Sequence, residues 1–192
     1  MRSLWIFAAC CLLALSSSPL AVHAREAAVT PIAETTALDK LFASLKTAKN
    51  KKEAGQITGK IWQHWFFHPN GAVQHLMHRA QAARRARLLK EAVSELDKII
   101  QLAPDYVEGW NQRATVLFML GRDDESVRDI QQVLRIEPRH FGALAGLGLI
   151  HMRAKNWKSA IASFERALKL HPFLGERAFI PALKKKLKGT EL

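Results

Sequence analysis

Residues 121–138, GRDDESVRDIQQVLRIEP, decide the fold, because related stretches stand at equal distances before and after them. The earlier stretch is residues 88–104, LLKEAVSELDKIIQLAP, and the later one is residues 155–172, KNWKSAIASFERALKLHP. The three stretches end at evenly spaced prolines: Pro104, Pro138 and Pro172. A fixed period of this length indicates a chain built from repeated structural units.

Apolar side chains recur at helical spacing inside each stretch. A small residue stands twelve positions before the proline, and apolar residues stand eight and five positions before it. These residues are Ala92, Leu96 and Ile99, then Ser126, Ile130 and Val133, and then Ala160, Phe164 and Ala167. The spacing places one apolar stripe along each of three helices.

Helical residues also precede the second and third stretches, at residues 107–120 and 141–154. Gly121 follows the first of these helices, where a residue with positive φ commonly ends a helix. Asp123 and Asn156 are expected to cap the helices that come next. Each unit is therefore predicted to be two helices joined by a tight turn, in an all-α protein rich in helix formers.

Position by position, the chain resembles the tetratricopeptide repeat (TPR) family, whose unit is a pair of antiparallel helices. The residues that match the family pattern are Ala92, Pro104, Trp110, Gly121, Pro138, Gly148 (with Leu147 before it), Ala160, Phe164, Ala167 and Pro172. The resemblance covers about residues 73–172. The first unit departs from the pattern, because Arg79 and Ala80 replace the usual Leu-Gly and Ala83 replaces the usual Tyr.

The resemblance implies a right-handed α-solenoid of antiparallel helix hairpins with about three repeats, at residues 73–106, 107–140 and 141–174. It also bears on three glycines that would otherwise suggest a phosphate-binding loop: Gly142, Gly146 and Gly148. A phosphate loop follows a strand, and here no strand pattern comes first. We expect Gly148 to be the small residue at which the first helix of the unit presses on the second.

Two flanking regions complete the array. Residues 37–72 are predicted to be helical, either as an N-terminal cap or as a diverged repeat. Within them, Trp62, Trp65 and Phe66 indicate either core packing or an exposed aromatic contact patch. Residues 175–192 are predicted to be a C-terminal capping helix with a basic tail, in which the lysines either solvate the cap or touch an anionic surface.

Residues 1–24 have the layout of a secretory signal peptide, with Arg2, an apolar stretch and small residues up to Ala24. Residues 25–36 are small and polar and are predicted to be a linker. Both cysteines of the chain, Cys10 and Cys11, fall in the leader. The exported protein, which we expect in the bacterial periplasm, would then have neither a disulfide nor a thiolate site.

The sequence shows no motif of a known catalytic chemistry, and we expect the protein not to be an enzyme. Four histidines are grouped along the chain: His64, His68, His75 and His78. Histidine pairs at such spacing can bind zinc or copper, but no acidic residue falls between these four and a Pro-Asn-Gly turn interrupts them. We therefore predict no metal and no cofactor, with ordinary helix-surface histidines as the simpler interpretation.

In TPR proteins the first helices of the repeats line a concave groove. The matching positions imply a partner-binding groove made of Met77, Gln81, Arg84, Asn111, Thr115, Phe118, Ala145, Leu149 and Met152. The groove would be basic in the first unit, polar in the second and apolar in the third, which fits a protein or peptide with an apolar anchor and an acidic residue. The lysine and asparagine clamp of chaperone-binding members is not matched, because other residues stand at those places: Met77, Gln81, Gln112, Gly142 and Gly146.

The formal charge of +12 leaves a second interpretation open. Arg84, Arg85 and Arg87, together with the C-terminal lysines, would also suit docking on an anionic membrane or cell-wall surface. We expect no nucleic-acid partner for an exported protein. High ionic strength separates the two interpretations, because it weakens surface docking more than binding in an apolar groove.

The leader pattern makes a direct prediction about processing. If residues 1–24 are removed on export, mass spectrometry of the secreted protein will find Arg25 at its N-terminus. A mature protein that retains Cys10 and Cys11 would contradict this prediction.

Overall fold

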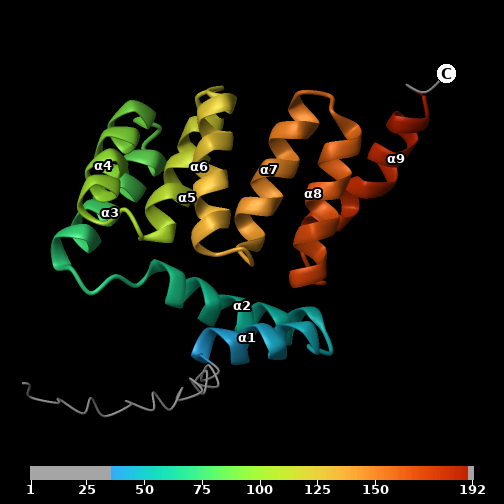
Figure 1. The fold of residues 1–192 in the computed structure, drawn as a ribbon, viewed down its shortest axis with the longest axis horizontal. Coiled ribbons are helices and arrows are strands. Elements are labelled where there is room, and N and C mark those ends of the chain that lie inside the picture. Colours follow the sequence, from blue (N-terminus) through green and yellow to red (C-terminus); the bar gives the residue numbers. More distant parts are fainter. Residues whose placement is uncertain (1–35, 190–192) are drawn as a thin grey trace, which may run out of the picture. The chain divides into compact units, whose positions relative to one another are not determined.

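The computed structural model describes residues 36–189. The signal peptide predicted at residues 1–24 and the linker predicted at residues 25–36, except Thr36, lie outside this part of the chain. Within it, the protein is all-α, as predicted (Figure 1). The helices are α1 (Ala37–Lys46), α2 (Lys51–Phe66), α3 (Gly71–Arg85), α4 (Leu89–Leu102), α5 (Val107–Met119), α6 (Asp123–Ile136), α7 (Phe141–Arg153), α8 (Trp157–Leu170), the 3-10 helix η1 (Gly175–Phe179) and α9 (Ile180–Lys188).

Helices α3 to α8 form three successive hairpins, α3–α4, α5–α6 and α7–α8 (Figure 1). Each hairpin turns on one residue with a left-handed backbone: Arg87 (φ 63°), Gly121 (φ 75°) and Lys155 (φ 57°). The next backbone N–H then donates to a carbonyl of the helix just ended, as in Arg122 to Leu117 at 2.9 Å. The predicted turn at Gly121 is confirmed, and its two counterparts make the same turn without glycine.

The second helix of each hairpin ends just before its proline, at Leu102, Ile136 and Leu170. Trp110 is half-buried, and its indole donates to the carbonyl of Pro104 at 2.9 Å. This bond fastens the start of α5 to the end of α4, so the tryptophan of the repeat pattern acts at a junction between units.

The two predicted helix caps have different outcomes. Asn156 caps α8, where its side chain accepts a hydrogen bond from the backbone of Ser159 at 3.3 Å. The prediction for Asp123 is wrong, because Arg122 occupies the cap position of α6 without a side-chain bond. The Asp123 carboxylate instead pairs with Arg153 of α7, so it links two hairpins.

The close approach of α7 to α8 occurs where Gly148 faces Phe164. A Cβ added at Gly148 would lie 2.5 Å from the Phe164 ring, and that ring is fully buried. Ala160 and Ala167 of α8 are fully buried as well. The missing side chain at Gly148 is thus what lets α7 approach its partner, in agreement with the sequence-based interpretation.

The α1–α2 hairpin lies against the ends of α5 and α8 and does not extend the stack in front of α3 (Figure 1). In α1, Asp39 accepts from Arg139 at 2.5 Å, and in α2 Thr58 bonds to His171 at 2.9 Å. Trp65 is 4% exposed, and the two other aromatic residues predicted beside it are half-buried, so this group packs against the rest of the protein.

The other end of the array is covered by η1 and α9. Leu183 is 3% exposed and packs in one cluster with Ile161 and Phe164 of α8. Lysines of α9 are exposed beside this contact, where Lys184 pairs with Glu165 at 3.2 Å. Among residues 36–189, no helix has the length and apolar character needed to cross a membrane.

Two alanine substitutions on α7 test the contact between Gly148 and Phe164. Gly148→Ala should lower the free energy of unfolding by about 1–3 kcal/mol, because the buried Phe164 ring must shift. Gly146→Ala is the control, since its Cβ would meet Ile130 at an ordinary 3.7 Å. That variant should be neutral or more stable by up to about 1 kcal/mol, as alanine favours a helix. Urea unfolding followed by circular dichroism measures both, and equal losses would contradict this account.

Candidate functional site

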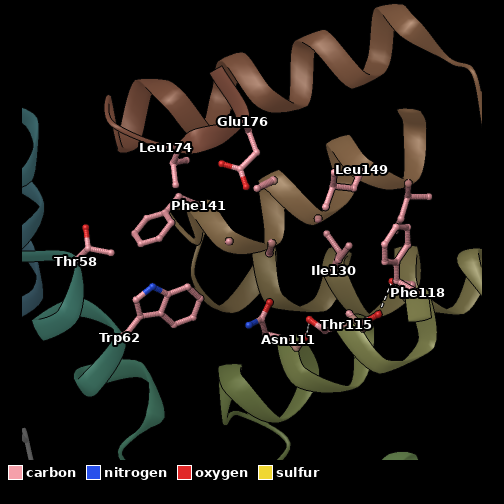
Figure 2. Close-up of a pocket in the computed structure, with 17 residues that line it drawn as sticks. Thr58, Trp62, Asn111, Thr115, Phe118, Ile130, Phe141, Leu149, Leu174 and Glu176 are labelled. Atoms are coloured by element: carbon pink, nitrogen blue, oxygen red, sulfur yellow. Dashed lines mark hydrogen bonds between the residues drawn. The ribbon is translucent and has the colours of Figure 1, made fainter. Parts of the chain in front are cut away.

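The candidate site is a cavity of about 300 Å³ lined by α2, α5, α6, α7 and the segment around η1. Figure 2 shows its labelled side chains facing a common space, with Trp62 on one side and Phe118 on the other. The lining residues are mostly apolar or small: Thr58, Trp62, Asn111, Ala114, Thr115, Phe118, Ser126, Ile130, Phe141, Gly142, Ala143, Ala145, Gly146, Leu149, Ile150, Leu174 and Glu176. Among these described residues, only Glu176 is charged.

Part of the groove predicted from the TPR pattern comes together in this cavity. Met152 lies apart from it and packs on the cluster that α8 makes with α9. Gln81 and Arg84 are half-buried on α3, a helix that contributes no lining residue. The predicted residues that do line the cavity are Asn111, Thr115, Phe118, Ala145 and Leu149.

The structure places Met77 in the core and not in the groove predicted for the first unit. Its side chain is only 2% exposed and belongs to the core between α3 and α4, together with Val73 and Ala80. These three residues share one helix face, so the side of α3 that Met77 occupies is packed and not an open groove. The basic end expected for the groove therefore does not extend the cavity.

At one side of the cavity, Arg153 fixes the position of Phe118. The guanidinium carbon lies 3.7 Å from the centre of the Phe118 ring, and both terminal nitrogens donate to the Phe118 carbonyl at 3.1 Å. The same guanidinium pairs with Asp123 at the start of α6. Stacking and pairing together hold the ring at the edge of the cavity.

Next to the cavity, a buried carboxylate gathers polar groups from α5 and from the start of α7. Glu108 is fully buried and accepts from His140 Nε2 at 2.8 Å. Its oxygens also accept from Asn111 at 3.1 Å and from Gln112 at 3.0 Å. Because His140 Nδ1 accepts from the Ala143 backbone at 3.0 Å, the hydrogen bonds assign the ring proton to Nε2. The network thereby fixes Asn111 at the cavity wall and caps α7.

The tryptophans of α2 cover this network. The Trp65 ring stacks on the His140 imidazole with 4.1 Å between the ring centres, and the Trp62 ring meets the same imidazole edge-on with 5.5 Å between the centres. Trp62 also lies over Gly142, where an added Cβ would come within 2.9 Å of the indole. Gly142 therefore gives Trp62 the space to form one wall of the cavity.

His171 joins α2 to the end of α8 through its bond to Thr58. Burial lowers the pKa of this imidazole below its ordinary value, because a charged ring would lose its hydration. The folded protein therefore favours the neutral ring. The stability that this preference contributes is present above the ordinary histidine pKa and is lost as the pH falls through the lowered one.

The sequence singles out Trp62 for core packing or aromatic contact, but it does not predict that this residue meets His140 and Glu108 at the site. His140, Glu108 and Trp62 are far apart along the chain, and their meeting depends on where α2 packs. No spacing or composition in the sequence indicates that packing. The sequence does indicate one contact of the network: Glu108 and Gln112 are one helical turn apart, so their side chains lie on one face of α5.

The four grouped histidines do not form a common site. His64, His75 and His78 are exposed, and His68 packs edge-on against Tyr106 at 4.9 Å. Within the described residues, no three side chains of the metal-binding types converge in a way that could hold an ion.

Comparisons with known proteins agree with this architecture. The tetratricopeptide repeat family model matches residues 111–174. A TPR repeat-containing protein of Rhizobium etli is 38% identical over 135 residues, which cover 70% of this chain and 66% of that protein. The mouse DnaJ homolog subfamily C member 7 is 34% identical over 80 residues, or 42% of this chain and 16% of that protein. The chain thus spans less than two thirds of the length of these relatives.

Solved structures show the same fold at low sequence identity. The first TPR domain of Spaghetti (RPAP3), bound to an HSP90 peptide, superposes with a TM-score of 0.58 at 17% identity, covering 60% of this chain and 93% of that one. The MamA protein gives a TM-score of 0.56 at 18% identity, covering 80% of this chain and 82% of that one. The stacked hairpins define a helical-repeat protein of the α-solenoid class. With its regular units and these matches, the chain is a tetratricopeptide repeat protein.

Removing the buried carboxylate tests whether it organises the site. Glu108→Ala leaves the His140 and Asn111 donors buried without an acceptor, so the free energy of unfolding should fall by about 3 kcal/mol or more. Glu91→Ala, at an exposed position on α4, is the control and should stay within about 0.5 kcal/mol of the wild type. Urea unfolding at neutral pH measures both losses. Similar small values for the two variants would show that Glu108 is not the centre of the network.

Proposed function

We propose that the protein is a non-enzymatic protein–protein interaction module that binds a segment of a partner in the cavity between α5, α6 and α7. The observation that carries this proposal is the cavity of about 300 Å³, a volume that suits a few side chains of a peptide. The residues proposed to contact the partner are Asn111, Thr115, Phe118, Ala145 and Leu149.

The lining favours a particular kind of segment. Phe118, Leu149 and Trp62 offer apolar surface, so the anchor of the partner is an apolar side chain. Glu176 contributes a negative charge, and Figure 2 shows it reaching from η1 toward the cavity. A hydrogen-bond donor or a cation beside the anchor suits this charge, whereas the acidic residue expected from the sequence would be repelled there.

The proposed location is outside the cytoplasm, in the bacterial periplasm. This part of the proposal rests on the sequence of residues 1–24, in which a basic start is followed by an apolar run and small residues. The related TPR protein of Rhizobium etli is bacterial, which is compatible with such a location.

The second candidate function, docking on an anionic membrane or cell-wall surface, draws on the exposed lysines of α9. Two lysines of this helix already have partners within the protein. Lys184 pairs with Glu165, and the Lys186 ammonium lies 5.2 Å from the centre of the Trp157 ring. These contacts favour a capping role for α9, so we place groove binding first.

A blocking substitution tests the groove. Thr115 lines the cavity and is exposed, so Thr115→Trp narrows the cavity without adding a ring to the core. Peptides selected on the wild-type chain from a random library should lose about tenfold or more in affinity for this variant, measured by fluorescence anisotropy. Gln131→Trp, at an exposed position of α6 outside the cavity, is the control and should bind as the wild type does. Equal affinities for Thr115→Trp and the wild type, or the failure to select any peptide, would contradict the proposal.

A further inference from the structure

A second surface, separate from the proposed groove, lies on the first hairpin, where α3 and α4 border a hollow of about 340 Å³. Leu88 is 51% exposed at this hollow, and the Arg79 side chain is 57% exposed. The hollow is therefore open to solvent in the part of the chain that the structure describes. The residues that line it are Arg79, Ala82, Ala83, Ala86, Leu88, Glu91 and Glu95.

The second hairpin contains a smaller hollow at the equivalent place. This second hollow has a volume of about 200 Å³ and lies between α5 and α6. Five of its lining residues stand one repeat length after lining residues of the first hollow: Arg113, Leu117, Arg122, Glu125 and Asp129. Its wall also includes Val93 and Asp97, which belong to the preceding helix α4. In the first hairpin, the described lining residues include none from a preceding helix.

The ion pairs show what the preceding helix contributes. Arg113 donates to both oxygens of Asp129 at 2.8 Å and uses its remaining terminal nitrogen for Asp97 of α4 at 2.6 Å. Arg79 occupies the equivalent place and donates to Glu95 Oε1 at 2.8 Å.

Glu95 is only partly satisfied by this arrangement. Lys98 donates to the same Oε1 oxygen as Arg79, at 3.2 Å. The other oxygen is buried and has no hydrogen-bond partner among the described residues, although only 9% of the side chain is exposed. The first hairpin thus holds an incomplete copy of the site that the second hairpin completes.

We propose that this hollow is the docking site for an acidic amphipathic helix of another protein, which stacks on α3 as α4 stacks on α5. The docked helix places a carboxylate at the position of Asp97 and an aliphatic side chain at the position of Val93, one helical turn earlier. Arg79 then binds that carboxylate while it turns to engage both oxygens of Glu95.

The small side chains and the charge of α3 select the occupant. Ala82 and Ala83 leave room for the backbone of the docked helix to come close. Residues 71–85, which form α3, include three arginines and no Asp or Glu, so an acidic side chain of the docked helix is attracted to the α3 side of the hollow. The two carboxylates of the hollow, Glu91 and Glu95, lie on the α4 side and direct that acidic side chain toward Arg79. A second copy of this chain is a poor occupant, because α9, the helix that covers the other end of its array, contains four lysines and no Asp or Glu.

A synthetic helix tests the docking site. The probe is a stapled, fluorescently labelled peptide with the sequence of residues 88–103, which includes Val93 and Asp97 of the helix that already borders the equivalent hollow. Fluorescence anisotropy should show saturable binding to the full chain. Arg79→Gln should weaken it about tenfold, as should Ala82→Trp, which fills the hollow from an exposed position. Arg85→Gln is the matched control, because it removes one charge from α3 outside the hollow and should change the affinity by less than about threefold.

The peptide itself supplies the second half of the test. Its Asp97→Asn form should bind the wild-type chain about tenfold more weakly and should lose little more on the Arg79→Gln chain, because both changes remove the same ion pair. The proposal is overturned if the peptide does not bind, or if Arg79→Gln and Ala82→Trp bind it as tightly as the wild type. Equal losses for Arg79→Gln and Arg85→Gln would also overturn it, since they would indicate general attraction to a basic surface. None of these outcomes depends on the cavity at Thr115.

Discussion

The hydrogen-bonded carboxylate of Glu108 is the contact on which the candidate site depends. It lies fully buried in α5 and accepts from His140, from Asn111 and from Gln112. One of these donors lines the cavity, and another carries the stacked ring of Trp65 from α2. A buried charge is tolerated only when its hydrogen bonds are made, so the order of the cavity wall and the position of α2 are coupled through one side chain.

The same repeat supports different chemistry in different units. At the place where Arg113 joins α4, α5 and α6 through two carboxylates, the third unit has Leu147, which packs on the apolar core. Ionic contacts therefore help to hold the first two units together, while the contact of Gly148 with Phe164 brings the helices of the third unit close. A polar junction specifies register through directed bonds, and an apolar junction specifies it through shape.

Periodicity predicts most of the fold but only part of the cavity lining. The proline spacing and apolar stripes determine where the hairpins begin and end, because both features follow directly from helix geometry. The family pattern assigns Met77 to the face of α3 that lines the groove. In the structure, Val73 and Ala80 are buried on that same face, so Met77 packs into the core. The packing of α2 over His140 is not predicted from the sequence, because it joins distant parts of the chain and is not part of the repeat pattern.

The two ends of the array differ in how their apolar and charged surfaces are satisfied. At the C-terminal end, Leu183 of α9 enters the cluster around Phe164. At the N-terminal end, α1 and α2 pack elsewhere, so α3 keeps an exposed face with arginine but no acidic residue. Among residues 36–189, the last repeat is capped and the first is open, which leaves one end of the solenoid at which a further helix can be added. At that end, Arg79 and the partly satisfied Glu95 offer an added helix a polar contact with a fixed direction. A surface that only faces solvent has no reason to keep a buried carboxylate oxygen without a hydrogen bond.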